Sequence, residues 1–310
     1  MSVPGRRNSL LAQAAAEPSS NLFPKWFLGA GQSKDLATRF RKHLWRILRS
    51  PFQVEWFDGL RIELYPKNEI CRSIFVTGIY EPNEFRFLSS FLGSGMTVID
   101  VGANMGLYTL FAARRVGEQG RVVSLEPSSR EYSALLHNVE LNQFRNVMAL
   151  PVAASDSCGT QDLLIAMFER SGHNTLGNFG YDTTALDHRQ TVQTITLDSL
   201  VDENAFERVD LIKMDIEGAE LAALKGARRL LSMYRPTLLL ELSDRALKYQ
   251  NATSQEIHSF LSGAGYVIYC FDPDSGLPAP LQARAYFDSE NVLCVPQSTA
   301  SCGTLPTYSG

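Results

Sequence analysis

From Met96 onward, short apolar runs alternate along the chain with longer segments whose apolar residues recur at helical spacing. Such runs are typical of strands that are buried on both faces, and such segments are typical of amphipathic helices. The sequence predicts strands at 97–101, 121–126, 146–154, 209–215, 236–242, 266–271 and 291–295, and helices at 106–116, 129–142, 218–232 and 254–265. Regular alternation of this kind predicts a parallel, doubly wound sheet covered by helices on both faces.

Other elements precede this series. Residues 34–50 predict a helix with apolar residues at every fourth position and basic residues around them. Two alternating runs flank the turn pair Asp58-Gly59 and predict a hairpin. A short helix is expected after Pro82. The predicted organisation is a loose leader at 1–33, a helix, hairpin and lead-in helix at 34–95, a main domain at 96–296 and a frayed tail at 297–310.

The alternation lapses between Ser157 and Thr196. Residues 159–169 and 190–197 have the composition of strands, and a polar loop, 171–189, joins them. A long loop of this type beside a strand end predicts a lid or a substrate-binding segment.

Composition excludes several classes of protein. The 310 residues carry a net charge of −4, so no basic field argues for a nucleic-acid partner. The five cysteines contain no C-x-x-C pair, which disfavours zinc and redox motifs and suits a reducing compartment. No run of about 20 apolar residues occurs, and we expect a soluble, cytoplasmic protein. The basic helix at 34–50 has two interpretations, a surface helix packed on the domain or a peripheral contact with an anionic membrane.

The stretch VIDVGANMGLYTL joins the first core strand to a helix through a glycine turn. Nicotinamide dinucleotide sites use G-x-G-x-x-G, whereas here Asn104 stands between Gly102 and Gly106. Asp100 at the strand end would repel a pyrophosphate but suits a cofactor with a cationic amino group, such as S-adenosylmethionine. Glu126, at the end of the second strand, is placed to accept ribose hydroxyls of either cofactor.

These motifs resemble those of the FkbM family of S-adenosylmethionine-dependent methyltransferases. The resemblance rests on DVGANMGLYTL, the following EP, VAASD, TLDSL and DLIKMDIEGAE, and covers roughly Tyr80 to Leu242. It implies a class I methyltransferase fold, with a mostly parallel seven-stranded sheet whose last strand is antiparallel. It also implies O-methylation, often of sugar hydroxyls on glycolipids, polysaccharides or natural products. By this resemblance the cofactor contacts are Tyr80, Glu81, Asp100, Gly102, Asn104, Gly106, Glu126 and Asp156. For Asp156, at the predicted adenine position, a plain turn residue is the competing interpretation.

A charged motif, KMDIEGAE, ends the fourth strand of the predicted sheet. In an extended strand Lys213, Asp215 and Glu217 would point the same way, at the edge where open α/β sheets bind ligands. Asp215 and Glu217 are candidates to bind substrate hydroxyls, act as a general base or hold a divalent metal, although nothing in the sequence requires a metal. Lys213 would keep one of them ionised. For Glu217, stabilisation by a helix N-terminus is the alternative.

Further candidates lie elsewhere in the chain. His173, in the polar loop, is a possible base because histidine titrates near neutrality, and a surface loop residue is the alternative. Asn174 beside it is a candidate to orient a sugar hydroxyl. Glu241 ends another strand, and Glu220 is a secondary candidate that a simple surface acid would equally explain.

The sequence therefore predicts a methyltransferase that acts on a small-molecule or carbohydrate hydroxyl and uses S-adenosylmethionine. Two alternatives remain open at this point: a nicotinamide-dependent oxidoreductase on a similar scaffold, and a non-catalytic module that only binds the cofactor. The sequence does not indicate the oligomeric state.

Overall fold

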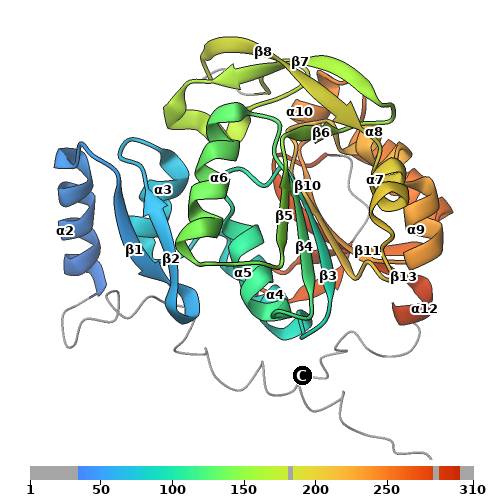
Figure 1. Ribbon diagram of the computed structural model, residues 1–310, viewed down its shortest axis with the longest axis horizontal. Helices are drawn as coiled ribbons and strands as arrows, with labels where there is room; N and C mark the ends of the chain where they lie inside the picture. The colour runs from blue at the N-terminus through green and yellow to red at the C-terminus, as the bar shows by residue number, and fades with distance from the viewer. Residues whose placement is uncertain (1–33, 181–183, 282–285, 301–310) are drawn as a thin grey trace, which may run out of the picture.

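A computed structural model describes residues 34–180, 184–281 and 286–300, so the predicted leader and residues 301–310 lie outside the described ranges. The main body is an eight-stranded sheet with helices on both faces (Figure 1). The strands are β1 (Phe52–Trp56), β2 (Leu60–Leu64), β3 (Thr97–Val101), β4 (Arg121–Leu125), β5 (Val147–Leu150), β6 (Val152–Ala154), β7 (Gly159–Ala166), β8 (Leu186–Ile195), β9 (Leu211–Met214), β10 (Thr237–Leu242), β11 (Tyr266–Phe271), β12 (Pro278–Pro280) and β13 (Glu290–Pro296). The α-helices are α2 (Lys34–Ile47), α3 (Glu69–Thr77), α4 (Pro82–Phe91), α5 (Leu107–Val116), α6 (Ser129–Leu141), α7 (Leu197–Asn204), α8 (Glu220–Lys225), α9 (Arg228–Tyr234), α10 (Asp244–Lys248), α11 (Ser254–Gly263) and α12 (Gln297–Ala300).

The strand order of the main sheet is β12-β11-β13-β10-β9-β3-β4-β5. Strands β5, β4, β3, β9 and β10 are parallel, and β13 inserts antiparallel between β10 and β11. This arrangement confirms the predicted doubly wound, mostly parallel sheet whose last main strand is antiparallel. The short β12 adds an eighth strand at the edge by pairing with β11.

Alternate residues of the central strands enter two separate cores. Ile99 packs with the helices α7, α8, α9 and α11, whereas Val98 packs with α4, α5 and the N-terminal extension. The near-continuous apolar strands are thereby buried on both faces, which explains why the sequence shows runs rather than alternation. Within the described residues no helix is long and apolar enough to cross a bilayer.

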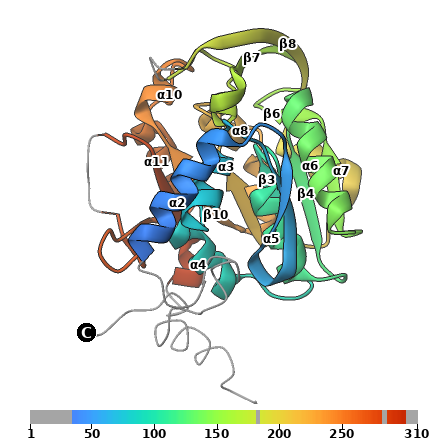
Figure 2. The same cartoon turned by 90° about the vertical axis from the view of Figure 1, so that its left-hand side faces the viewer.

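The N-terminal extension contains the predicted basic helix and hairpin, together with a helix that the sequence did not predict. Helix α3 begins after Asn68, whose side chain accepts a hydrogen bond from the amide of Cys71, and ends at Gly78 with φ +83°. An asparagine N-cap and a glycine in the left-handed region are the usual signals of helix ends. Figure 2 shows α2 lying across α3 on the outside of the molecule.

Two predicted elements are broken in the structure. The strand predicted at 146–154 divides at Pro151, which has no amide hydrogen for a sheet hydrogen bond, into β5 and β6. The helix predicted at 218–232 divides at Gly226 into α8 and α9. A Cβ at Gly226 would lie 2.1 Å from the carbonyl oxygen of Ser155, so only glycine permits this contact. At the C-terminal end, the first residues of the predicted frayed tail form α12.

After Pro151 the chain leaves the main sheet and forms a three-stranded sheet of order β6-β8-β7. It lies over the carboxyl ends of the main strands, at the top of Figure 1. The polar loop predicted at 171–189 joins β7 to β8. Its first residues complete a 3-10 helix, Phe168–His173, that begins in the predicted strand, and its last residues belong to β8.

Candidate active site

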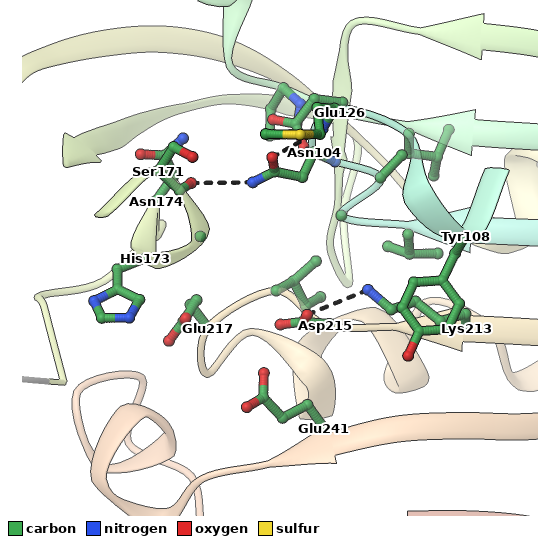
Figure 3. A pocket seen from close by; sticks show the side chains of 18 of the residues that line it. Asn104, Tyr108, Glu126, Ser171, His173, Asn174, Lys213, Asp215, Glu217 and Glu241 are labelled. Carbon is green, nitrogen blue, oxygen red and sulfur yellow. Dashed lines mark hydrogen bonds and ion pairs between the residues drawn. The ribbon is translucent and has the colours of Figure 1, made fainter. Parts of the chain in front are cut away.

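A cavity of about 480 Å³ opens at the carboxyl ends of β3, β9 and β10. This is the edge at which open α/β sheets bind ligands, and the volume is typical of sites for small organic molecules. Most of the predicted site residues meet here, and Figure 3 shows many of them pointing toward the open space. The wall includes Tyr80, Gly102, Asn104, Glu126, His173, Asn174, Lys213, Asp215, Glu217 and Glu241.

The turn between β3 and α5 needs glycine at two positions. Gly102 has φ +79°, and a Cβ on it would lie 2.0 Å from the carbonyl oxygen of Asp215. Gly106 has φ +96°, and a Cβ on it would lie 2.7 Å from the side chain of Leu135. Only glycine combines this backbone conformation with such close packing. The turn is therefore pressed against the loop that follows β9, which carries the acidic residues.

Asn104 lies between these glycines with φ +50°. Its Oδ1 accepts the amide of Met105, and its Nδ2 donates to the carbonyl oxygen of Ser171 at 3.1 Å. The side chain thus fixes the turn and joins it to the segment between β7 and β8. Contact of Asn104, Gly102 and Gly106 with a cofactor stays a prediction.

Glu126, just after β4, is buried and held in one orientation by two backbone amides. Its Oε2 accepts the amide of Asn104 at 2.8 Å, and its Oε1 accepts the amide of Ser128 at 2.9 Å. Burial, and then the nearby Glu131 carboxylate, raise the pKa of Glu126 to about 8. Each carboxylate oxygen keeps a free lone pair, so the group can still accept two ligand hydroxyls.

Lys213 of β9 is a buried cation among carboxylates. Its Nζ lies 3.2 Å from Oδ2 of Asp215 and 4.7 Å from the ring centre of Tyr108. Burial alone would lower the pKa of Lys213, but three carboxylates outweigh it and raise the pKa. In order of effect they belong to Asp215, Asp100 and Glu81. Burial likewise opposes ionisation of Asp215, but the Lys213 ammonium overcomes it and lowers the pKa of that carboxyl.

Three acids meet on the floor of the cavity. Carboxylate oxygens of Asp215, Glu217 and Glu241 lie within 4.8 Å of one another (Figure 3). Burial, followed by the charge of Asp215, raises the pKa of both Glu217 and Glu241 well above the ordinary value. Oxygen ligands in this number and spacing suit a hard divalent cation, and without one they suit proton sharing or hydroxyl binding.

Glu217 lies beyond the end of β9, in the turn before α8, so it does not continue the strand alternation of Lys213 and Asp215. Its φ is +51°, and it is followed by Gly218 with φ +101°. Oε1 of Glu220 accepts the amides of Ile216 and Gly218 and so holds this turn. Glu220 is buried, not a surface acid, and it positions Glu217 rather than lining the cavity.

His173 and Asn174 reach the cavity from the segment between β7 and β8. Nδ1 of His173 hydrogen-bonds Oγ1 of Thr184 at 2.5 Å, and its Nε2 lies 3.6 Å from Oε1 of Glu69. Burial, and then the charge of Arg170, lower the pKa of His173, which leaves the imidazole neutral near pH 7. Asn174 uses its Oδ1 to accept the amide of Ala166, so its side chain also has a structural task.

Tyr80 lines the cavity, whereas Glu81 lies just behind the wall. Glu81 accepts hydrogen bonds from Tyr108 and from Asn291, and burial together with the charge of Asp215 raises its pKa to about 7. Tyr108 also lines the cavity, beside Lys213, but in the sequence it is hidden among the apolar residues of the helix that follows the glycine turn.

Four predicted cofactor residues do not line the cavity: Glu81, which lies behind the wall, Gly106, Asp100 and Asp156. Asp100 is fully buried beneath α5, where its Oδ2 accepts the hydroxyl of Thr109 at 2.6 Å. It acts on the site through Lys213, its register neighbour on β9. Asp156 is exposed, and its carboxylate accepts the hydroxyl of Ser157, which fits the turn interpretation. Its place in the wall is taken by the apolar residues Ala153 and Ala154.

The family and the proteins to which this chain is similar are described as methyltransferases. A family model described as the methyltransferase FkbM domain matches residues 100–268. Methyltransferase sdnD of Sordaria araneosa is 28% identical over 160 residues, which cover 44% of this chain and 61% of that protein. Methyltransferase 1 of Beauveria bassiana is 26% identical over 149 residues, with 42% and 57% covered.

Among solved structures, the methyltransferase FkbM from Methylobacillus flagellatus is similar, with a TM-score of 0.41 and 20% sequence identity. The match covers 72% of this chain and 52% of that one. The chain thus spans about three fifths of the length of the two fungal relatives and about half of the bacterial structure.

Proposed function

Because residues 100–268 match the FkbM methyltransferase domain, the chain belongs to the FkbM family of methyltransferases, and we propose that it transfers a methyl group from S-adenosylmethionine to an acceptor hydroxyl. One observation carries this proposal. A single cavity has Glu126, the carboxylate expected to accept ribose hydroxyls, on one side and three clustered acids on the other (Figure 3).

The cofactor would occupy the part of the cavity between the glycine turn and Glu126. The Glu126 carboxylate, fixed by two amides, accepts the two ribose hydroxyls. Ala153 and Ala154 give an apolar surface on which an adenine ring can pack. S-adenosylmethionine, when bound, supplies an electrophilic methyl group on a sulfonium.

The acceptor would occupy the acidic part of the cavity. An alcohol is a weak acid, so a base within hydrogen-bond reach of its proton accelerates the transfer. We assign this task to Glu217, because burial and the charge of Asp215 raise its pKa well above the ordinary value and because it lines the cavity from a turn that Glu220 holds. Asp215 is less suited, since Lys213 keeps its pKa low, and it would accept an acceptor hydroxyl and orient it.

We favour a hydroxyl-rich acceptor such as a sugar, a glycolipid or polysaccharide unit, or a natural product. Carboxylates are strong acceptors for O–H donors, and Asp215, Glu217 and Glu241 together offer several lone pairs. The resemblance of the motifs to those of the FkbM family supports the same class.

A divalent cation on the three acids is the alternative chemistry for this half of the site. It would lower the pKa of Glu217 and Glu241 and acidify a bound hydroxyl directly. A chelator distinguishes the metal-free reaction from the metal-dependent one. Only the metal-dependent reaction would stop in a chelator and resume when Mg²⁺ or Mn²⁺ is added.

The other functions considered for this sequence have less support. A nicotinamide-dependent oxidoreductase is inconsistent with membership of a methyltransferase family. A non-catalytic binding module would not need the buried Lys213–Asp215 pair beside two acids of raised pKa.

The testing experiment has two parts. Calorimetry of the full chain with S-adenosylhomocysteine, and with NAD as control, should give binding of the first alone. Transfer from S-adenosylmethionine carrying a labelled methyl group should then be measured on a panel of hydroxyl acceptors. The wild type, Glu217→Gln and the exposed control Asp156→Asn would be compared.

Transfer by the wild type and the control, but not by Glu217→Gln, supports the proposal. Binding of NAD in place of S-adenosylhomocysteine would refute the cofactor assignment. Equal transfer by Glu217→Gln would refute the choice of base.

A further inference from the structure

Among the residues that the structure describes, helix α2 is packed against the molecule by one side. Trp45 is buried against Phe52 and Phe75, with ring centres 6.4 and 5.4 Å away. Nε of Arg41 donates to the carbonyl oxygen of Val76 at 3.0 Å, at the end of α3. These contacts fix which side of α2 faces away from the protein.

The outward side carries two large apolar residues. Phe40 is 65% exposed and Ile47 is 57% exposed. Phe40 is the most exposed large apolar side chain of the described part of the chain, and Ile47 is exceeded only by it and by Met233. Residues seven positions apart lie about two helical turns from each other on one face, so Phe40 and Ile47 form a single apolar strip.

Basic side chains flank this strip. Arg39, Lys42 and Arg46 are exposed, and within the described ranges none of them forms an ion pair. From residue 36 to residue 54 the sequence contains five Lys and Arg residues and no Asp or Glu, although the whole chain has a net charge of −4. The positive charge is therefore local to this helix and its surroundings.

We propose that α2 is a docking surface for an anionic membrane, with Phe40 and Ile47 entering the headgroup layer and Arg39, Lys42 and Arg46 contacting lipid phosphates. An exposed apolar strip beside unpaired cations is the pattern of helices that lie in a bilayer interface. A nucleic acid would use the cations but would leave Phe40 and Ile47 in water.

The position of α2 in the fold agrees with this role. It lies at the outer edge of the molecule (Figures 1 and 2). Its neighbour α3 contributes Ile70 and Arg72 to the wall of the cavity described above. Docking through α2 thus places the membrane one helix away from the site, although the docking itself does not depend on the activity.

The test is co-sedimentation of the full chain with vesicles, of phosphatidylcholine alone and of phosphatidylcholine mixed with phosphatidylglycerol. One variant removes the apolar strip (Phe40→Ser with Ile47→Ser), and another removes the charges (Arg39→Gln, Lys42→Gln and Arg46→Gln). A control variant combines Met233→Ser with Lys225→Gln and Lys248→Gln, all exposed elsewhere.

We expect binding to the anionic vesicles only, weakened by salt. Each charge removed should weaken partition about fivefold, so the triple change should weaken it about 100-fold. Loss of the apolar strip should also weaken it, while the control binds as the wild type does. Melting temperatures should be unchanged, because all these side chains are exposed.

Four results would overturn the proposal. The first two are absence of binding to anionic vesicles and vesicle binding that the control variant loses equally. The third is a self-association in light scattering that the apolar variant abolishes, which would assign the strip to a contact between two copies. The fourth concerns nucleic acid. Binding to duplex DNA that exceeds vesicle binding and ignores Phe40 and Ile47 would assign the charges to nucleic acid.

Discussion

The raised pKa of Glu126 makes a quantitative prediction for ligand binding. In the free protein this pKa is about 8. Ribose hydroxyls donate to a carboxylate, so a nucleoside should bind the ionised form. About a tenth of the protein is ionised at this position near pH 7 and about nine tenths near pH 9. Affinity should therefore rise about tenfold over this interval, which is about 1.4 kcal/mol.

The suitable ligand is 5′-methylthioadenosine, because it keeps the ribose but lacks the amino and carboxyl groups that would add their own titration. Calorimetry at several pH values in this range gives the change of affinity with pH directly. Glu126→Gln has the same shape and cannot ionise, so its affinity should be weaker and independent of pH. A flat profile for the wild type, or the same slope in Glu126→Gln, would refute the assigned pKa or the ribose contact.

The Glu126 carboxyl also makes the folding stability depend on pH, in the direction opposite to that of ligand affinity. Its folded pKa lies above the unfolded value of 4.5. The stability it contributes is complete below that value and is lost as pH rises through about 8. The melting temperature of the free protein should fall over the interval in which affinity rises. Glu126→Gln should show a smaller fall.

Other predictions follow from the geometry. Gly102→Ala should destabilise the protein by about 1–3 kcal/mol, because Gly102 has a positive φ and an added Cβ would clash with Asp215. Gly263→Ala is the control, because a Cβ there meets open space, and thermal unfolding measures both variants. If Glu217 is the base, Glu217→Gln should lower kcat about 10²- to 10⁴-fold with little change in affinity for S-adenosylhomocysteine; unchanged kcat would contradict the assignment. Asp215→Asn should destabilise the fold by about 3–5 kcal/mol, because it leaves the buried Lys213 short of its main partner; an unchanged melting temperature would show that the pair is not needed.

Much of the architecture follows from local patterns in the sequence. The apolar runs identify the strands, and the order of strand, glycine turn and helix identifies where the cavity forms. Glu126 and Lys213 could be predicted as site residues because strand ends meet at one edge of a parallel sheet. Glu241 could be suspected for the same reason, and it joins the acidic cluster.

Side-chain direction depends on tertiary packing, so a sequence pattern alone does not show which polar residues near a strand end reach the cavity. Asp100 shares its strand face with Val98, and that face lies under α5, so its carboxylate turns to Thr109 instead of the cavity. Asp156 was predicted at the adenine position after the third strand, but the chain leaves the main sheet at Pro151 and Asp156 follows β6 instead. Helix α3 has clear ends, but its short length hides its period.

The departure at Pro151 also has a consequence for engineering and for evolution. The segment that leaves the sheet starts on β6 and returns on β8, and these strands are paired, with Val152 opposite Gln193 and Ala154 opposite Ile195. Its two ends are therefore side by side, which is the condition under which segments are exchanged without disturbing a host domain. This segment also supplies His173 and Leu163 to the cavity wall. Grafting a different segment between residues 152 and 195 therefore offers a route to changing this wall of the cavity while the rest of the FkbM-family scaffold is kept.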